Sequence, residues 1–291
     1  MCRLFGMSAA PHRVHATFWL LEAEDSLAEQ SRRMPDGTGL GTFNPEGAPR
    51  VEKQPLAAYE DPQFAREAKD RESRTFVAHV RYATTGESVA VNTHPFEQKG
   101  RLFAHNGVVE DLPALEDELG SYRDLVRGDT DSERFFALIT RRIDEHDGDV
   151  AAGIASAVGW IADNLRMLAI NFVMVSDDEM WAFRYPDTHD LLVLLRHPGG
   201  TGGRRHLDHA SAAGTVRARS GALATLPAVV VATEQMDEDP AWESLCPGEL
   251  LHVGPKLEVS RTVILDRAPA HRLTLDDLTG HAAAAQAPSP R

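Results

Sequence analysis

Residues 1–6 read Met-Cys-Arg-Leu-Phe-Gly, so a cysteine stands at the second position of the chain. Cysteine is small enough for the preceding Met to be removed, and the mature chain would then begin at Cys2. That processing places a thiol and a free α-amine on one residue. An α-amine has a pKa of about 7.7–8.0, and its pairing with a nucleophile is an established route of activation. Taken alone, this position is more often that of a small buried apolar residue.

The composition around Cys2 is that of an acidic globular protein. The 291 residues fit one large domain or two small ones, at about 150 residues per domain. Hydrophobic residues make up 42% and charged residues 25% of the chain, which is typical of globular proteins. With 30 Lys and Arg against 44 Asp and Glu, the net charge is −14. This charge argues against a nucleic-acid backbone or an anionic membrane as the main partner.

The N-terminal segment lacks the pattern of a targeting signal. A secretory signal opens with basic residues and continues with about 7–15 apolar ones, whereas the apolar run after Cys2 breaks at once. No stretch approaches the roughly 20 apolar residues of a membrane helix. We therefore expect a cytoplasmic protein. The only cysteines, Cys2 and Cys246, exclude a disulfide-built scaffold, and no role is assigned to Cys246.

Hydrophobic patterning predicts strands toward both ends of the chain and helices in the middle. The main expected strands are 2–8, 76–82, 168–175, 180–185, 191–196, 227–233, 249–253 and 257–265, and the main helices are 131–143 and 150–165. This order favours α+β layers over a doubly wound βαβ series. The Ala- and Pro-rich residues 281–291 are expected to be disordered.

The chain also offers the groups that acyl transfer to a cysteine needs. Asn106 and the Gly107 N–H could stabilise an oxyanion, although an Asn-Gly step between apolar runs is by itself more typical of a hairpin turn. Arg81, at the end of an expected strand, could clamp a carboxylate. Asp131 could hold an ammonium group, and its alternative is a helix cap or a first-turn acid.

Six short segments follow one another in a recognisable order. They are Met-Cys-Arg-Leu-Phe-Gly at 1–6, Asp-Gly-Thr-Gly at 36–39, Ala-His-Val-Arg-Tyr-Ala-Thr-Thr-Gly-Glu at 78–87, Asn-Thr-His-Pro-Phe at 92–96, His-Asn-Gly at 105–107 and Thr-Asp-Ser-Glu at 130–133. Through them the chain resembles the class II glutamine amidotransferases, whose nucleophile is an N-terminal cysteine. Thr38 stands where many of these relatives have Trp, which removes no catalytic group.

The resemblance implies an α+β fold, a four-layer αββα sandwich of the N-terminal-nucleophile hydrolase type with two antiparallel sheets between helical layers. Residues 1–265 would form this domain, and residues 266–291 would be a C-terminal tail with a disordered end. Such a tail is too short for a synthase domain, so the chain resembles the stand-alone branch. The segment 232–242 is similar to the γ-glutamyl-removing enzymes of ergothioneine and glutathione pathways in that branch, and its alternative is an acidic surface loop.

The resemblance also implies a role for each matching residue. Cys2 would be the nucleophile, and Asn106 with the Gly107 N–H would form the oxyanion hole. In the substrate pocket, Arg81 would bind the α-carboxylate, Thr84 would shape the pocket, Asp131 would hold the α-ammonium and His94 would support the site. Arg33 and Asp36 would order the N-terminus.

The expected reaction is cleavage of the γ-amide of glutamine or a γ-glutamyl amide through a glutamyl thioester, releasing glutamate and an amine or ammonia. One alternative is a glutaminase subunit that supplies ammonia to a separate synthase. Another is a non-catalytic amino-acid-binding module. No cofactor or metal is expected, since the 13 histidines show no zincin-type spacing. The expected partner is a small γ-glutamyl molecule, and a homodimer is left open.

Overall fold

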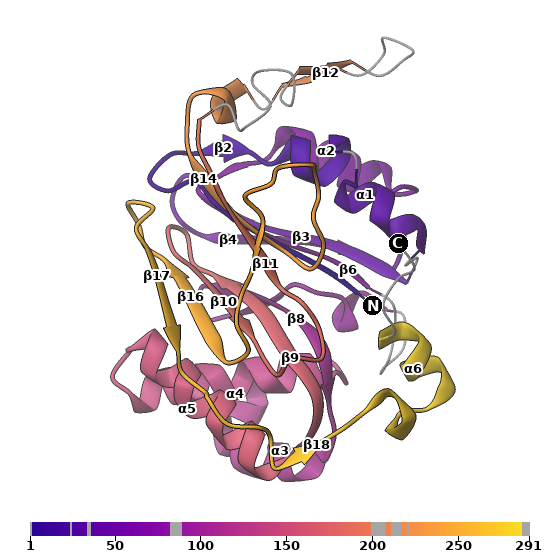
Figure 1. The fold of residues 1–291 in the computed structure, drawn as a ribbon, viewed down its shortest axis with the longest axis vertical. Helices are drawn as coiled ribbons and strands as arrows, with labels where there is room; N and C mark the ends of the chain where they lie inside the picture. Colours follow the sequence, from indigo (N-terminus) through magenta and orange to yellow (C-terminus); the bar gives the residue numbers. More distant parts are fainter. Residues whose placement is uncertain are drawn as a thin grey trace.

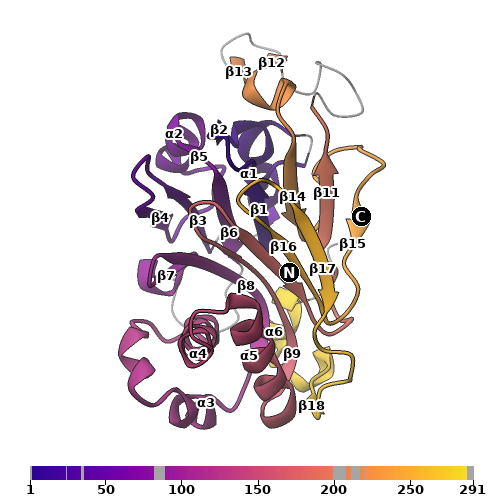
Figure 2. The ribbon, with the colours of Figure 1, turned by 90° about the vertical axis from the view of Figure 1, so that its left-hand side faces the viewer.

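The computed structural model describes residues 2–23, 25–33, 36–81, 89–198, 208–210, 217–219 and 221–286. Two large antiparallel sheets lie face to face, and helices lie on the outer side of each sheet (Figure 1 and Figure 2). This arrangement confirms the predicted α+β sandwich with the layer order αββα.

The first sheet has seven strands and holds the N-terminal strand in its interior. In spatial order they are β15 (Glu243–Ser244), β11 (Leu192–Arg196), β14 (Ala228–Ala232), β1 (Arg3–Ser8), β6 (Thr75–Arg81), β3 (Gly37–Phe43) and β4 (Pro49–Gln54). Arg3 lies opposite Val80 on one side of β1, and Phe5 lies opposite Ala232 on the other. Because both edges of β1 are paired, the preceding residue, Cys2, has a fixed place in the fold.

The second sheet presents β8 near one edge. Its strands in spatial order are β17 (Val259–Val263), β16 (Glu249–Val253), β10 (Met180–Arg184), β9 (Arg166–Val175), β8 (Arg101–Val109) and β7 (Phe96–Gln98), and β18 (His271–Arg272) pairs in parallel with β9. Short pairs join β2 (Val14–His15) to β5 (Glu72–Ser73) and β12 (Asp208–Ala210) to β13 (Arg217–Arg219). The strand β7 reaches only the first residues of β8, pairing Phe96 with Phe103.

The strand β8 corrects one expectation from the sequence. Asn106 and Gly107 do not form a hairpin turn, because β8 continues through both and pairs them with Asn171 and Ile170 of β9. A Cβ on residue 107 would lie 1.8 Å from the carbonyl oxygen of Ala169. The glycine therefore serves the close approach of two strands, and the local preference of an Asn-Gly step for turns is overridden by sheet pairing.

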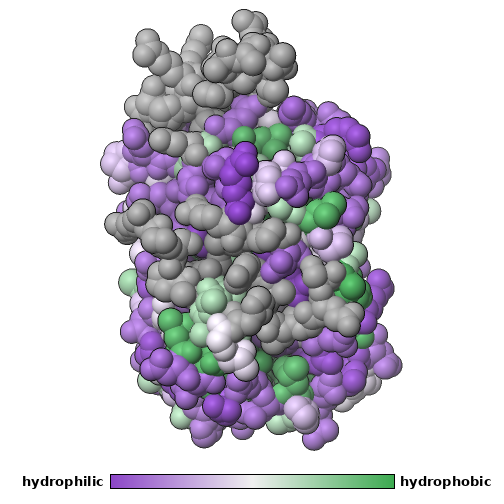
Figure 3. All heavy atoms as spheres, turned by 90° about the vertical axis from the view of Figure 1, so that its right-hand side faces the viewer, coloured by the Kyte–Doolittle hydropathy of each residue, from purple (hydrophilic) through white to green (hydrophobic). Residues whose placement is uncertain are grey.

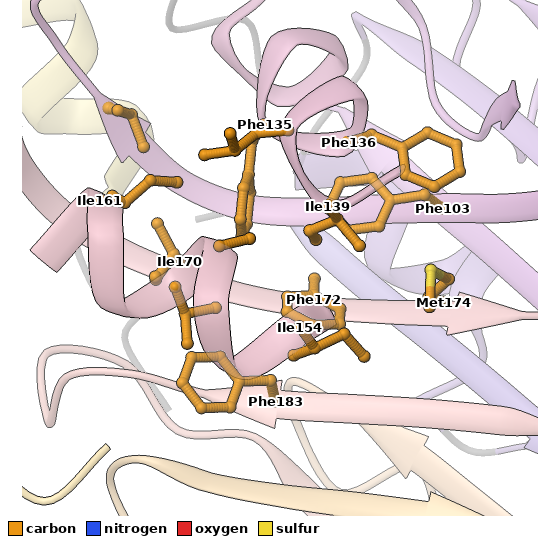
Figure 4. Close-up of a cluster of buried hydrophobic side chains, with 14 of the residues drawn as sticks. Phe103, Phe135, Phe136, Ile139, Ile154, Ile161, Ile170, Phe172, Met174 and Phe183 are labelled. Atoms are coloured by element: carbon orange, nitrogen blue, oxygen red, sulfur yellow. The ribbon is translucent and has the colours of Figure 1, made fainter. Parts of the chain in front are cut away.

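Three hydrophobic clusters fill the spaces between the layers. Leu4 of β1 and Val173 of β9 belong to the cluster between the two sheets. A larger cluster lies between the second sheet and its helices (Figure 4), where the rings of Phe103 and Phe136 stack with centroids 4.8 Å apart. A third, which includes Trp19, covers the outer face of the first sheet. Burial of each such large side chain contributes roughly 1.5–3 kcal/mol.

Four of the described α-helices begin after a residue whose side chain caps the helix. On the first sheet lie η1 (Phe18–Glu22), α1 (Leu27–Gln30), η2 (Ser31–Arg33) and α2 (Pro62–Asp70), and on the second lie α3 (Leu112–Leu119), η4 (Gly120–Leu125), α4 (Asp131–Glu145) and α5 (Val150–Asn164). The short helices η3 (Ala90–Asn92), η6 (Gly221–Ala224) and η7 (Leu275–Asp277) lie in connections. The four capped helices are α1, α2, α4 and α5. Thr130 caps α4 by accepting a hydrogen bond from the Glu133 N–H at 3.3 Å.

The C-terminal segment differs from the prediction of disorder over residues 281–291. Residues up to 286 form the helix α6 (Gly280–Gln286), in which Ala285 and Gln286 are buried. A run of four alanines favours the helix, and its contacts with the rest of the molecule remove those side chains from water. Residues 287–291 lie outside the described residues, and the proposed boundary at residue 265 stays a prediction.

On the face shown in Figure 3, most of the coloured residues are hydrophilic. The large apolar side chains exposed in the described part of the chain are Leu56, Tyr59, Val89, Val91, Leu195 and Val263. Among the described helices, none has the length and apolar character needed to cross a membrane.

Candidate active site

A small pocket, partly open to solvent, gathers most of the residues that the sequence singled out. Its lining comes from the start of β1, the end of β6, the loop before β7, the middle of β8, the start of α4 and the end of α6. The lining residues are Cys2, His79, Arg81, His94, His105, Asn106, Gly107, Thr130, Asp131, Ser132 and Gln286. The cysteine, the oxyanion candidates and both charged substrate-binding candidates therefore share one cavity.

Cys2 is buried and directly precedes β1 of the first sheet. The Asn106 side-chain amide donates to the Cys2 carbonyl oxygen at 3.1 Å, which links β1 to β8 across the two sheets. Beyond Cys2, the Leu4 N–H donates to the Thr233 hydroxyl at 3.3 Å, and the fully buried Arg3 forms an ion pair with Glu234. These contacts tie the N-terminal segment to β8 and to the residues that directly follow β14.

Gly107 turns its backbone N–H and C=O away from β9. It lies opposite Ile170, but the Ile170 N–H donates to the Tyr185 carbonyl on the far side of β9 at 2.8 Å. The two residues therefore form a non-hydrogen-bonded pair, and the backbone groups of Gly107 point to the other side of β8. Two residues later, the Val109 N–H points the same way and donates to Asp131 at 2.9 Å. The Gly107 N–H thus faces the side on which the pocket lies.

Asp131 is the first residue of α4 and is almost fully buried. One carboxylate oxygen accepts the Val109 N–H, and the other lies 3.4 Å from the Ser132 hydroxyl. The same hydroxyl is 2.9 Å from Nδ1 of His105. Helix and strand are therefore joined by residues that line the pocket, and the negative charge lies at the N-terminus of a helix, where the dipole favours it.

Arg81 is the last residue of β6, and its guanidinium is the positive charge in the pocket lining. Burial lowers the pKa of its guanidinium, and neighbouring negative charges oppose that shift. The opposing groups are the thiolate form of Cys2 and the carboxylates of Asp36 and Asp131. Because an arginine stays protonated in proteins, Arg81 remains a cation in a site that also contains a carboxylate. The pocket thus offers one charge of each sign.

Three buried histidines complete the lining. His79 and His94 face each other with ring centroids 4.2 Å apart. Burial, followed by the charges of Arg81 and His105, lowers the pKa of His79 to about 3, and burial lowers the pKa values of His94 and His105 as well. All three are therefore neutral near pH 7. A Cβ at residue 39 would lie 1.9 Å from the His94 carbonyl oxygen, so Gly39 allows this loop to reach the pocket.

The remaining predicted residues, Arg33, Asp36 and Thr84, are not among the described residues that line the pocket. Asp36 precedes β3, and its N–H donates to the Arg81 carbonyl at 3.2 Å, so it contacts the strand that carries the cation. Thr84 lies outside the described residues. Arg33 ends η2, and its side chain is not among those described. Cys246 is exposed and does not line the pocket.

Sequence reasoning missed several residues that build the site. Ser132 and Gln286 line the pocket, while Arg3, Thr233 and Glu234 hold the N-terminal strand. Their partners lie far away along the chain, up to 229 residues apart for Leu4 and Thr233. Arg3, Ser132 and the Thr-Glu pair at 233–234 lie in segments that resemble relatives, but no role was assigned to them, and Gln286 lies in no such segment. Within the described residues, no group of three or more His, Cys, Asp or Glu is arranged to hold a metal ion.

Known proteins similar to this chain include glutamine amidotransferases and a γ-glutamyl hydrolase. Residues 1–270 match the model of the family described as "Glutamine amidotransferases class-II". The chain is 29% identical over 260 residues to the putative glutamine amidotransferase YafJ of Escherichia coli K12, covering 86% of this chain and 96% of that protein. It is 25% identical over 221 residues to the gamma-glutamyl-hercynylcysteine sulfoxide hydrolase of Mycolicibacterium smegmatis, covering 75% and 77% of the two chains.

The fold has solved counterparts. The glutamine phosphoribosylpyrophosphate amidotransferase of B. subtilis matches with a TM-score of 0.63 and 18% identity, over 92% of this chain and 50% of that chain. At that identity the likeness concerns the fold alone. The family match over residues 1–270 decides the rest: this chain belongs to the class II glutamine amidotransferases, and it is an enzyme of amide hydrolysis.

Proposed function

We propose that the enzyme cleaves the γ-amide of glutamine or of a γ-glutamyl amide through a glutamyl thioester on Cys2. The observation that carries the proposal is the convergence of Cys2, the outward-facing Gly107 N–H, Arg81 and Asp131 in one pocket. A γ-glutamyl group presents an α-carboxylate, an α-ammonium and a carbonyl. The pocket offers a cation, a carboxylate and a nucleophile, one for each.

Binding in this proposal uses the two buried charges. Arg81 takes the α-carboxylate through its planar guanidinium, which suits a two-pronged contact. Asp131 takes the α-ammonium, since a carboxylate can accept about four hydrogen bonds. Neutral His79, His94 and His105 line the cavity without adding a third charge. The charges of Arg81 and Asp131 therefore match the α-carboxylate and the α-ammonium of a zwitterionic amino acid.

The first chemical step needs Cys2 to be the first residue of the mature chain. Its α-amine takes the thiol proton, and the thiolate attacks the γ-carbonyl carbon. The Gly107 N–H donates to the oxyanion that forms. Asn106 has a second amide hydrogen besides the one on the Cys2 carbonyl, and this hydrogen is the other donor. The Cys2 ammonium then protonates the departing nitrogen, and the C–N bond breaks to leave the thioester.

The second step returns the enzyme to its starting state. The α-amine of Cys2 takes a proton from water, and the resulting hydroxide attacks the thioester carbon. Collapse of the tetrahedral intermediate breaks the C–S bond, releases glutamate and returns the proton to sulfur. His79 is an unsuitable base for either step near neutral pH, because its pKa is about 3. The α-amine is matched to that pH.

The leaving group distinguishes the stand-alone reaction from ammonia supply. The relative from M. smegmatis is named for a γ-glutamyl substrate, and the E. coli relative matches over 96% of its own length. These observations favour hydrolysis of a γ-glutamyl amide by this chain alone. Transfer of ammonia to a separate synthase is the second candidate, favoured by the structural match to half of a larger amidotransferase.

The test is glutamate release by the purified protein from glutamine and from a panel of γ-glutamyl amides, after mass analysis of the N-terminus. Release by the protein alone supports the first candidate. Release that requires an added partner protein supports the second. If the chain begins at Cys2 and binds glutamine but turns over no substrate of the panel, the proposed cleavage through Cys2 is contradicted. Full activity with Met1 retained contradicts the amine as base.

A further inference from the structure

The C-terminal helix α6 reaches the same pocket as Cys2. In Figure 1 and Figure 2 it lies beside the N-terminal end of β1, and Gln286 lines the pocket. The side chain of Gln286 is almost fully buried, with 1% of the residue exposed, while Ala284 on the same helix is exposed. A buried primary amide is costly unless its polar atoms are satisfied. The hydrogen-bond partners of the Gln286 amide therefore indicate its role.

The side-chain amide of Gln286 bridges the His189 imidazole and the Gly107 carbonyl oxygen. Its Oε1 lies 2.9 Å from Nε2 of His189, and its Nε2 donates to the Gly107 carbonyl oxygen at 3.4 Å. A carbonyl oxygen only accepts, so the amide nitrogen faces Gly107 and the amide oxygen faces a protonated Nε2 of neutral His189. Glutamine satisfies both neighbours at once, whereas glutamate would place a carboxylate oxygen against the Gly107 carbonyl.

Gln286 contacts β8 at a position beyond the end of its pairing with β7. The strand β7 pairs with β8 only between Arg101 and Phe103, so at Gly107 the second sheet offers no described strand on that side. The Gly107 carbonyl and N–H point to this open side together. Gln286 therefore occupies the place of a missing ladder partner, and it does so beside the N–H that faces the pocket.

The chain that leads into α6 is fixed by successive contacts. β18 pairs with the first residues of β9, and Leu273 packs against Val108 and Leu168. Thr274 and Asp277 then form a capping box at η7. Two of these contacts are made with β8 and β9 themselves. The segment before α6 is therefore fixed relative to β8, the strand that Gln286 contacts.

We propose that Gln286 is a positioning residue that holds Gly107 in the orientation needed to stabilise the oxyanion. The inference rests on the proposed role of the Gly107 N–H. The hydrogen bond to the carbonyl limits rotation of the peptide groups on both sides of Gly107, so the N–H stays aimed at the reacting oxygen. The effect belongs to the transition state, because the carbonyl of the bound substrate carries less negative charge than the oxyanion.

The test compares Gln286→Ala, Gln286→Asn and Gln286→Glu with the exposed control Ala284→Gln. Loss of one direct oxyanion donor costs about 10²–10³ in kcat, so loss of a positioning contact is expected to lower kcat for glutamine about tenfold in Gln286→Ala. The KM is expected to change less than threefold. Gln286→Glu should lose about 100-fold at pH 7.5 and recover part of that loss toward pH 5, as its carboxyl group takes up protons. Ala284→Gln should match the wild type.

Each result decides the proposal. A kcat for Gln286→Ala within twofold of the wild type overturns it, and so does a loss confined to KM. If Gln286→Ala unfolds, the nearly isosteric Glu variant gives the answer: an unchanged kcat and pH profile overturns the proposal. Failure of the proposed function looks different, because the wild type itself would then release no glutamate, or release it at an equal rate in Cys2→Ala.

Discussion

The two ends of the chain meet at one pocket but are held there in different ways. β1 is paired on both edges, and Arg3 and Leu4 are tied to the residues that follow β14. α6 has seven residues and reaches the pocket through the bridge that Gln286 makes to His189 and Gly107. The comparison teaches that the nucleophile is held by strand pairing on both edges of β1, whereas Gln286 is held at the pocket by hydrogen bonds of its side chain.

The largest effect is expected from the N-terminal end. Cys2→Ala removes the nucleophile and should lower turnover of glutamine by at least about 10³-fold, since loss of a nucleophile removes the covalent route. Binding of glutamine should remain, because Arg81 and Asp131 are untouched. Steady-state kinetics and calorimetric binding measure the two properties. Cys246→Ala, at the exposed cysteine, is the control; equal loss in both variants contradicts the assignment.

The substrate cation should give the next largest effect. Arg81→Ala leaves the α-carboxylate without a partner, and the loss of a buried charged contact costs about 2–5 kcal/mol. We expect KM for glutamine to rise about 100-fold, with a smaller change in kcat. Arg81→Lys keeps the charge but not the planar fork, so it should fall between. A KM equal to that of the wild type in Arg81→Ala would place the carboxylate elsewhere.

The support of the N-terminal strand should appear in stability. Glu234→Gln breaks the ion pair with the fully buried Arg3, and hydrogen bonds between charged groups contribute about 1.5–3 kcal/mol. Because Glu234 is partly exposed, we expect a loss of about 1–2 kcal/mol in the free energy of unfolding, measured by urea denaturation. The exposed neighbour Glu238→Gln should change it by less than about 0.5 kcal/mol. Equal losses would contradict a specific role for the pair.

The support of the C-terminal helix should appear in the pH dependence of stability. Burial lowers the pKa of His189 from 6.5 to about 4, so between these values the unfolded chain binds more protons than the native one. Stability is therefore fully present above about pH 6.5 and is lost as the pH falls toward about 4, with a slope of up to about 1.4 kcal/mol per pH unit. His189→Gln should make the decline shallower in urea titrations from pH 7 to 4. An unchanged slope would show that His189 is not held neutral.

Much of the fold was readable because its signals are local. The expected helices at 131–143 and 150–165 match α4 and α5 within two residues, and the expected strand 249–253 matches β16. Amphipathic spacing, together with a side chain suited to capping at Thr130, is written in consecutive residues. The approach of Cys2, Arg81, Asn106 and Asp131 was also predicted, through resemblance to a family whose motifs they match. Their roles in catalysis stay predictions.

The failures share a physical cause. The turn expected at Asn106–Gly107 is a local preference, and the strand that overrides it, β9, begins about sixty residues later. The disorder expected after residue 281 followed composition, but docking against the pocket supplies the burial that an isolated Ala-rich helix lacks. No sequence pattern predicts that Arg3 pairs with Glu234 or that Gln286 bridges His189 and Gly107, because these partners are brought together by the tertiary fold.

The alternation of β8 carries a consequence for how this protein tolerates insertions and deletions. Odd-numbered residues of β8 direct their backbone groups toward β7 and the pocket, and even-numbered ones toward β9. One residue added between Arg101 and Asn106 would exchange the two directions if the Arg101 end kept its register. Every motif residue would still be present, yet the Gly107 N–H would point into the sheet. Single-residue changes in length in this segment should therefore be more damaging than conservative substitutions of its buried side chains.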